Sequence, residues 1–201
     1  MKRTNTLYII IGLLTLFTSG ASAQHHMRDV FAQMPDSLLP LLTQNNRLDC
    51  IDFIENNMPA KVKNRFDTYS ELKTLTANYL LLRPSAHSQV EMKLFTRAEQ
   101  GDTILCMVHT VESRNAADSY VRFYDLAWNE LSEVCSRPQA NAFMDEGIDI
   151  EARGILCGLT LIKASLSAET PTLTWQLQTG VLPPDLREKA IEKVHDIQVE
   201  L

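Results

Sequence analysis

Apolar side chains recur at helical spacing through residues 28–58. The run Met34-Pro35-Asp36-Ser37 interrupts this pattern and supplies an N-cap for the leucine-rich stretch that follows. The apolar positions of the second helix are then Leu48, Ile51, Ile54 and Met58. Pro59 ends the pattern, because a proline disfavours the α conformation at the residue before it. We therefore expect two short amphipathic helices in this segment.

From about Tyr79 the apolar spacing changes to a period of two, which is typical of strands. The alternating apolar positions are Val90, Met92 and Leu94. A turn-like Glu99-Gln100-Gly101-Asp102 follows, and the stretch from Thr103 to Val111 is apolar on both faces, as in a central strand. These segments predict a β-hairpin.

A third strand is expected after the polar loop from Glu112 to Asp118. Val121 and Phe123 share one of its faces, and the other face carries Tyr120, Arg122 and Tyr124. Short polar links cannot support parallel crossovers, so three consecutive strands predict an antiparallel meander.

The last third of the chain predicts more sheet. Residues 132–150 are polar and indicate a long connection, and Gly154 to Ser165 and Thr172 to Thr179 then predict a second hairpin. The expected fold class is α+β, with short N-terminal helices followed by mostly antiparallel sheet. We expect one domain over residues 24–201, with 24–131 and 152–201 as candidate lobes.

Residues 1–23 have the three parts of a secretory signal peptide. Lys2 and Arg3 form a positive start, Leu7 to Phe17 form an uncharged apolar region, and Ala21-Ser22-Ala23 is a cleavage pattern. The apolar run is about 11 residues long, against the roughly 20 that an α-helix needs to cross a bilayer. We expect cleavage, no stable membrane anchor, and a mature chain in the periplasm or outside the cell.

The composition, with 45% hydrophobic and 22% charged residues, is that of a globular protein and disfavours disordered, fibrous and multi-pass membrane classes. Removing residues 1–23 takes away two basic residues and leaves 17 basic against 25 acidic ones, a formal charge of −8. Such a field repels phosphate backbones. Nucleic acid is therefore not expected as a partner, whereas an envelope protein or a glycan is.

Four cysteines, Cys50, Cys106, Cys135 and Cys157, lie too far apart for a redox C-x-x-C motif or a zinc ribbon. In an oxidising compartment they permit three complete disulfide pairings, among which the sequence does not choose. The alternative is that they are small buried hydrophobes, since Cys106 and Cys157 fall within the apolar segments expected to be strands.

Several runs of the chain resemble one known family. These runs are Met27-Arg28-Asp29-Val30-Phe31, Met34-Pro35-Asp36-Ser37-Leu38-Leu39, Arg47-Leu48-Asp49-Cys50-Ile51-Asp52-Phe53 and Ser165-Leu166-Ser167-Ala168. Over nearly the whole mature chain the sequence resembles a Bacteroidales family of secreted proteins of unknown function, which carry one such domain behind a signal peptide. The resemblance implies an origin and a location, and it assigns no catalytic residue. The C-terminal end departs from the family's pattern.

Two candidate binding sites emerge from the residues. Tyr120, Arg122 and Tyr124 form a candidate aromatic and cationic surface for a glycan or a partner, the alternative being half-buried cross-strand pairs. Cleavage after Ala23 would expose Gln24-His25-His26, whose amine, backbone nitrogens and imidazole suit square-planar Cu(II) or Ni(II). Cyclisation of the terminal glutamine would block that amine.

Standard nucleophile, metalloprotease and nucleotide-binding motifs are absent from the sequence. Cys106 and His109, three residues apart on a strand, point to opposite faces and cannot share a proton. A catalytic pair of Cys106 with another histidine, such as His87 or His195, is left open by the sequence. We expect no cofactor and a non-enzymatic binding or assembly module of the envelope. The alternative is a periplasmic enzyme with a Cys/His or carboxylate site that one sequence does not identify.

Overall fold

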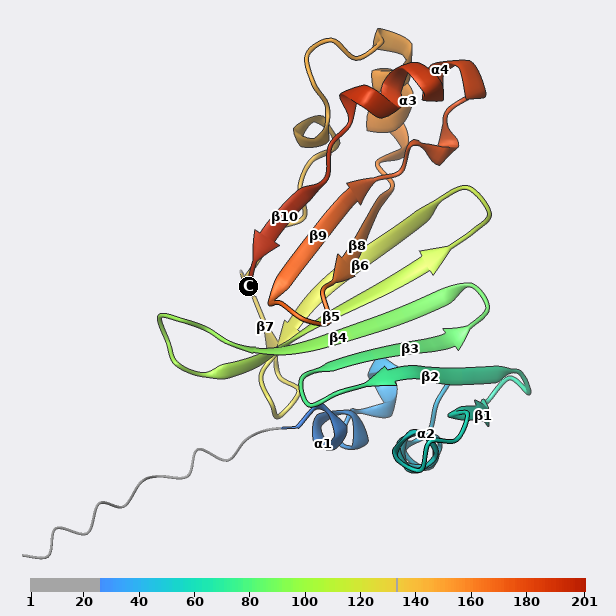
Figure 1. Ribbon diagram of the computed structural model, residues 1–201, viewed down its shortest axis with the longest axis vertical. Coiled ribbons are helices and arrows are strands. Elements are labelled where there is room, and N and C mark those ends of the chain that lie inside the picture. The colour runs from blue at the N-terminus through green and yellow to red at the C-terminus, as the bar shows by residue number, and fades with distance from the viewer. Residues whose placement is uncertain (1–25, 133) are drawn as a thin grey trace, which may run out of the picture.

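The computed structural model describes residues 26–132 and 134–201 (Figure 1). The predicted signal peptide, residues 1–23, lies outside the described residues. The α-helices (α) and 3-10 helices (η) are α1 (Met27–Ala32), η1 (Asp36–Leu38), α2 (Gln44–Glu55), η2 (Ala140–Phe143), α3 (Ile150–Leu159), η3 (Thr179–Val181), α4 (Pro184–Ala190) and η4 (Ile191–Lys193).

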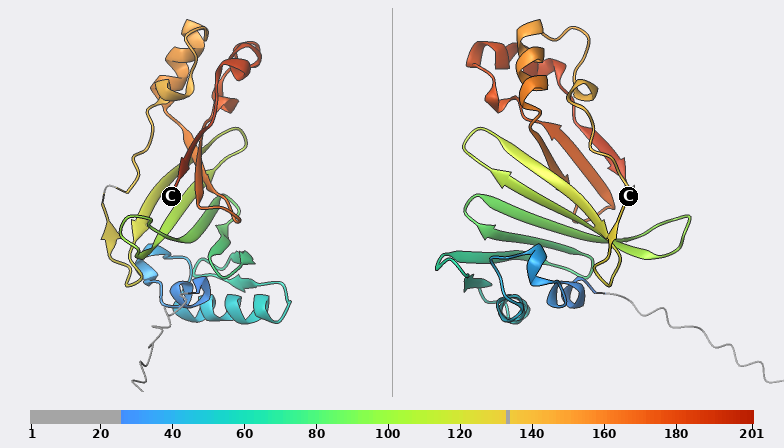
Figure 2. Two further views of the ribbon diagram at one scale, coloured as in Figure 1. Left: turned by 60° about the vertical axis from the view of Figure 1, so that its left-hand side comes forward. Right: turned by 180° about the vertical axis from the view of Figure 1, so that it is seen from behind.

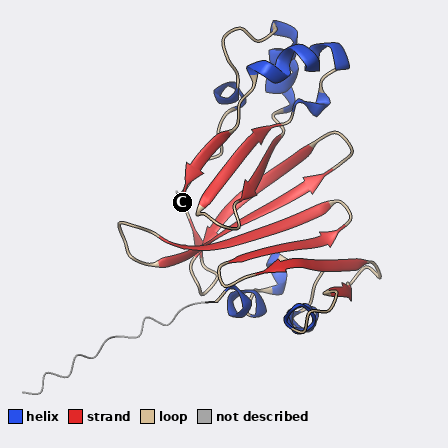
Figure 3. Cartoon of the chain, viewed as in Figure 1, coloured by secondary structure: helices blue, strands red, loops and turns tan. Residues whose placement is uncertain are grey.

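The described strands form two antiparallel sheets. One sheet has seven strands in the order β1 to β7, and the other has three in the order β10-β9-β8. The strands are β1 (Lys61–Lys63), β2 (Tyr69–Leu75), β3 (Tyr79–Ser85), β4 (Ser88–Thr96), β5 (Thr103–Glu112), β6 (Ala117–Tyr124), β7 (Glu130–Leu131), β8 (Ile162–Leu166), β9 (Thr172–Leu177) and β10 (Ile197–Glu200). The helices gather at the two ends of the long axis, with the strands between them (Figure 3). The α+β fold class is thereby confirmed.

Two α-helices do occupy the N-terminal segment, but their bounds differ from the prediction. The leucine-rich stretch after Ser37 forms only the short η1 and turns, because Pro40 interrupts it. The second helix is instead capped by Thr43, whose hydroxyl accepts a hydrogen bond from the Asn46 backbone N–H at 3.2 Å. The Asn46 side chain accepts the Thr43 N–H in return, which completes a capping box.

The predicted meander is confirmed in the consecutive pairing of β4, β5 and β6. Val90 lies opposite His109, and His109 lies opposite Tyr120. The strands β1 and β2 were not predicted. The pairing of β2 with β3 shifts register between Leu72 and Thr74, so the alternation that marks a strand is broken there.

The second predicted hairpin is correct for β8 and β9 but wrong at its start. Residues 154–159 lie in α3, where a strand was expected, so Cys157 is helical. The Asp149 side chain caps this helix by accepting the Glu151 backbone N–H at 2.8 Å, and Thr160 ends it in the left-handed conformation. The polar connection before α3 contributes Phe143, which is fully buried.

Alternate residues of β4 and β5 feed two separate cores on the two faces of the large sheet. The α1/α2 face includes Met27, Phe31, Ile51, Leu82 and Met107. The β8–β10 face includes Phe95, Cys106, Phe123, Ile162 and Trp175, so it draws on both candidate lobes. The turned views keep α1 and α2 at the end opposite α3 and α4 (Figure 2). The two candidate lobes therefore pack against each other through a shared apolar core.

Side chains of the large sheet cap the free edge of β8. The Ile162 backbone N–H donates to Asp118 Oδ1 at 3.1 Å, and the Ala164 N–H donates to Ser119 Oγ at 2.9 Å. The Leu166 backbone also hydrogen-bonds the buried Glu91. An edge strand normally presents unpaired donors, and here they are satisfied internally. This docking fixes β8, and with it Lys163, over the large sheet.

Candidate functional site

A recess lies where the two sheets meet, and we call it the junction recess. It is lined by the β5–β6 turn (residues 112–117) and, from the C-terminal part of the chain, by Lys163, Gln178, Gly180 and Arg187. Its volume is about 400 Å³. A cavity of this size is within the range of small-ligand sites.

Gly180 allows the two sides of the junction recess to touch. A Cβ atom on Gly180 would lie 2.0 Å from the carbonyl oxygen of Asn115, a separation that no real side chain tolerates. The β5–β6 turn and η3 are therefore in backbone contact, on the right-hand side of Figure 1. Only glycine, which has no Cβ, permits this approach.

Three cations line the junction recess and form no ion pair with a carboxylate of the described residues. Within residues 26–132 and 134–201, no carboxylate lies within 4.0 Å of Arg114, Lys163 or Arg187. The lining carboxylate, Glu112, is paired with Arg83. The recess thus concentrates positive charge in a chain whose net charge is negative.

The Arg187 side chain is held in place at the rim of this recess. Its Nη2 donates to the carbonyl oxygens of Gly180 at 2.6 Å and Leu182 at 2.8 Å, and its Nε has no partner among the described residues. A guanidinium fixed by the backbone loses little further conformational entropy on binding an anion. Arg187 is therefore a preorganised cation.

A second depression, which we call the sheet hollow, adjoins the junction recess. Its lining includes Lys61, Tyr69, Arg83, Ser85 and His87, and its volume is about 470 Å³. The Arg83–Glu112 ion pair joins the two depressions, because Arg83 lines one and Glu112 the other. The Glu112 backbone N–H also donates to the His87 carbonyl at 2.9 Å.

The predicted aromatic and cationic surface is only partly assembled. Tyr120 is 44% exposed, its hydroxyl is hydrogen-bonded to His109 Nδ1, and its ring centroid lies 5.5 Å from Arg122 Cζ. Arg122 is also paired with Glu130 at 2.9 Å. Tyr124 shares this face but is 2% exposed. The charge of Arg122 and the hydroxyl of Tyr120 are thus already satisfied within the protein.

His109, a neighbour of that surface, is half-buried. Burial lowers its pKa below the ordinary value, which favours the neutral imidazole. Cys106 lies on the opposite face of β5 in the other core, as the alternation predicts. Neither residue lines the junction recess or the sheet hollow.

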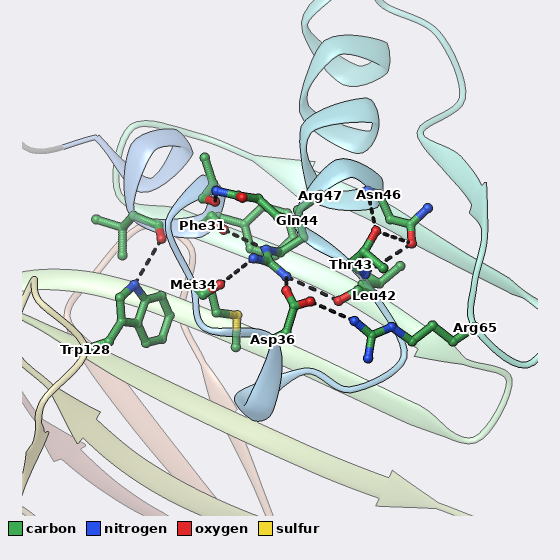
Figure 4. Close-up of polar contacts among 12 residues, drawn as sticks. Phe31, Met34, Asp36, Leu42, Thr43, Gln44, Asn46, Arg47, Arg65 and Trp128 are labelled. Carbon is green, nitrogen blue, oxygen red and sulfur yellow. Dashed lines mark hydrogen bonds and ion pairs between the residues drawn. The ribbon is translucent and has the colours of Figure 1, made fainter.

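A buried arginine organises the N-terminal segment (Figure 4). Arg47 is 1% exposed, and its guanidinium donates to the carbonyl oxygens of Phe31, Met34 and Leu42 and to Asp36 Oδ1. The hydrogen bond from Arg47 lowers the pKa of Asp36. Because all these partners belong to the protein itself, the cluster is an internal brace for the turns between α1 and α2.

A polar cluster is sealed between the two sheets. The Tyr79 hydroxyl donates to Glu91 Oε1 at 2.8 Å, and Lys93 Nζ donates to the Ala168 carbonyl at 2.6 Å. Desolvation raises the pKa values of Glu91 and Tyr79 and lowers that of Lys93. None of these three side chains lines the junction recess or the sheet hollow.

The four cysteines are free thiols in the structure. Cys50 and Cys106 are buried in different cores, on opposite faces of the large sheet, so they are not positioned to pair. Burial raises the pKa of Cys50 to about 12 and also raises that of Cys106, which keeps both protonated. Cys135 and Cys157 are partly exposed.

The two histidines proposed as partners of Cys106 lie elsewhere. His87 is in the β3–β4 turn at the sheet hollow, and His195 Nδ1 lies 3.5 Å from Asp145 Oδ1. Two residues of the predicted copper or nickel site, Gln24 and His25, lie outside the described residues. The third, His26, is exposed. The described part of the chain contains no cluster of three metal-ligating His, Cys, Asp or Glu residues.

No helix in the described ranges is both long and apolar enough to span a membrane. The comparison with family models matches residues 19–196 to a family described as "Protein of unknown function (DUF3256)". No curated protein and no solved structure matches the chain. Those matched residues include the seven-stranded sheet, β8, β9 and every residue that lines the junction recess, and β10 begins just after them at Ile197.

Proposed function

We propose that this chain, which belongs to the DUF3256 family of proteins of unknown function, is an exported, non-enzymatic binding module whose junction recess holds an anionic ligand. The observation that carries the proposal is the set of cations around that recess. Arg114, Lys163 and Arg187 come from three different elements, and none has a carboxylate within 4.0 Å among the described residues. Like charges held together repel one another, and a bound anion relieves that repulsion.

The distribution of perturbed groups favours binding over catalysis. Active sites usually place side chains with displaced pKa values inside a cleft. Here Glu91, Lys93 and Cys106 have displaced pKa values and are sealed in the protein interior. His109 and Tyr120, whose pKa values are also displaced, line neither depression, and the recess is lined by cations at the surface.

The proposal of export rests on the signal-like pattern of residues 1–23. Export would also determine in which compartment the protein meets its anionic ligand. A protein delivered beyond the inner membrane meets the glycans and proteins of the envelope. We propose that one of these carries the anionic group, and that the protein works in the periplasm or outside the cell.

A charge-neutralising variant tests the binding proposal. Arg114→Gln with Lys163→Gln removes two recess cations, neither of which makes a side-chain hydrogen bond within the described residues. The matched control is Lys189→Gln with Lys193→Gln, which makes the same charge change at α4 and η4, outside the recess. Calorimetric titration with inorganic phosphate measures the affinity of each protein.

We expect the recess variant to bind phosphate at least about tenfold more weakly than the wild type, because each charge-assisted hydrogen bond contributes about 1.5–3 kcal/mol. The control variant should bind as the wild type does. Equal affinities for both variants would refute the junction recess as the anion site. N-terminal analysis of the native protein tests export separately, and an intact Met1 would contradict it.

A further inference from the structure

Both depressions lie on the face of the large sheet that β8–β10 covers only in part. Side chains on this face form a row across the strands, with Lys61 opposite Glu71, Glu71 opposite Arg83, and Arg83 paired with Glu112. The row runs from β1 to β5, which is roughly 19 Å at the usual strand spacing of about 4.8 Å. The two depressions therefore lie along one row of side chains, with the Arg83–Glu112 ion pair between them, and we call the two together the trough.

Both ends of this trough carry cations that are unpaired within the part of the chain that the structure describes. Glu71 is paired with Lys73 at 2.7 Å and Glu112 with Arg83, so both lining carboxylates are already neutralised. At the hollow end, Lys61 has no carboxylate within 4.0 Å among the described residues, and its Nζ lies 4.8 Å from the centroid of the Tyr69 ring. At the other end are the three cations of the junction recess.

The hollow end also offers an aromatic surface and hydroxyl partners. Tyr69 is 58% exposed, so much of its ring area is available to a ligand. Thr68 and Ser85 also line this end, with hydroxyls that are hydrogen-bonded to Asn64 Oδ1 at 3.0 Å and to Ser88 Oγ at 2.7 Å. Glu71 and His87 supply further hydrogen-bonding groups. The C–H face of a sugar ring packs on aromatic rings, and its hydroxyls both donate and accept hydrogen bonds.

The backbone beneath the trough favours a sugar over a peptide. The strands β2 to β4 are each paired on both sides, so their backbone groups are engaged in the ladders of the sheet. A peptide laid across β2 to β4 would find no free strand edge there with which to pair its own backbone groups. Recognition must come from side chains, which suits a polyhydroxylated chain with separated negative charges.

We infer that the ligand is an oligosaccharide bearing carboxylate or sulfate groups, which spans the trough with one anionic group in the junction recess and one sugar stacked on Tyr69. This inference rests on the proposed function, because it names the ligand class of the same recess. Both anionic groups accept charge-assisted hydrogen bonds from guanidinium and ammonium groups.

The test compares ligands of different length and charge by calorimetry, using protein produced from the full-length chain. The probes are a single uronic acid, a linear oligouronate chosen to match the row of roughly 19 Å, a sulfated and a neutral oligosaccharide of equal length, and an oligoglutamate peptide. The hollow variant is Tyr69→Ala with Lys61→Gln. Its control is Phe66→Ala with Lys189→Gln, since Phe66 is 76% exposed and lines neither depression.

We expect the oligouronate or the sulfated chain to bind the wild type at least about tenfold more tightly than the single uronic acid, and the neutral chain to bind weakly. Preference for one of the two anionic chains identifies the charged group and supports the inference either way. The hollow variant should lose the advantage of the longer ligand and keep its affinity for the single uronic acid. The control should retain both affinities.

Two results would overturn the inference and leave the proposed function standing. One is an oligosaccharide affinity that the hollow variant leaves unchanged while the Arg114→Gln, Lys163→Gln variant still lowers it. The other is binding of the oligoglutamate as tight as that of the anionic sugars, because charge alone would then suffice. If no anionic probe depends on the recess cations, the proposed function fails as well.

Discussion

The contact at Gly180 allows a sharp test of how the two sheets are joined. Replacing Gly180 with alanine places a Cβ atom 2.0 Å from the Asn115 carbonyl oxygen, well inside the 3.0 Å below which real Cβ contacts essentially do not occur. Both atoms belong to backbone segments, so no flexible side chain can move aside. The β5–β6 turn or η3 must shift by about 1 Å or more, which opens the junction recess.

Overpacking of this kind costs about 1–3 kcal/mol. For a protein of this size each kcal/mol lowers Tm by about 2–4 °C, so Gly180→Ala should lower Tm by roughly 2–12 °C. It should also weaken phosphate binding, because Arg114 moves relative to Lys163 and Arg187. Calorimetric melting and the phosphate titration measure the two effects.

The matched control is Gly154→Ala, which introduces the same methyl group inside α3. A Cβ at Gly154 would meet no atom within 4 Å. Alanine in a helix interior is more stable than glycine by about 0.5–1 kcal/mol, so this variant should raise Tm by roughly 1–4 °C. Its phosphate affinity should stay that of the wild type. If Gly180→Ala left both Tm and phosphate affinity unchanged, the close backbone contact would be refuted.

Three further predictions follow from the protein's interior. Arg47→Met leaves three backbone carbonyls and Asp36 without their hydrogen-bond donor, so it should lower the free energy of unfolding in urea by about 3–5 kcal/mol. Arg65→Gln, which removes an exposed ion pair with Asp36, should lower it by at most about 1 kcal/mol. Equal losses in the two variants would contradict the role of Arg47 as an internal brace. Because desolvation raises the pKa of Glu91, the native state holds its proton more tightly than the unfolded state, so the unfolding free energy should fall as pH rises from 4.5 through the folded pKa. Glu91→Gln should remove that decline, and a wild-type slope in the variant would exclude Glu91 as its source. Native protein treated with a thiol reagent should be modified at Cys135 and Cys157 before Cys50 and Cys106, because the latter are buried; mass spectrometry that finds all four modified at one rate would argue against this packing.

The strands of the meander could be predicted because their alternation is strong and local. β4 carries the apolar residues Val90, Met92 and Leu94 at every second position toward the α1/α2 core, and β5 is apolar on both faces from Ile104 to Val108. The helix α3 could not be recognised in the same way. Its apolar run with Gly154 and Gly158 was interpreted as a strand, although Asp149 provides an N-cap that would have marked a helix start.

The junction recess could not be predicted, because its cations are scattered along the chain. Arg114, Lys163 and Arg187 are separated by tens of residues, and they meet only because β8 docks across the large sheet. The formal charge of −8 on residues 24–201 argued against nucleic acid as a partner and gave no sign of a local anion site. A total charge averages over the surface, whereas recognition depends on the local field.

The predicted surface around Tyr120 illustrates the opposite case. Alternation placed Tyr120, Arg122 and Tyr124 on one face, and the structure places them there. Alternation does not reveal whether a face is covered, and here Trp128 packs on Tyr124 with ring centroids 5.4 Å apart. Glu130, on the neighbouring strand β7, also neutralises Arg122.

A backbone amide NMR titration with inorganic phosphate tests the central claim most directly. The account predicts saturable shifts confined to the β5–β6 turn, to Lys163 and to residues 178–180, with the shifts lost in the Arg114→Gln, Lys163→Gln variant. Shifts centred on Tyr120 and Arg122, or shifts that persist in the variant, would contradict an anion site at the junction of the two sheets.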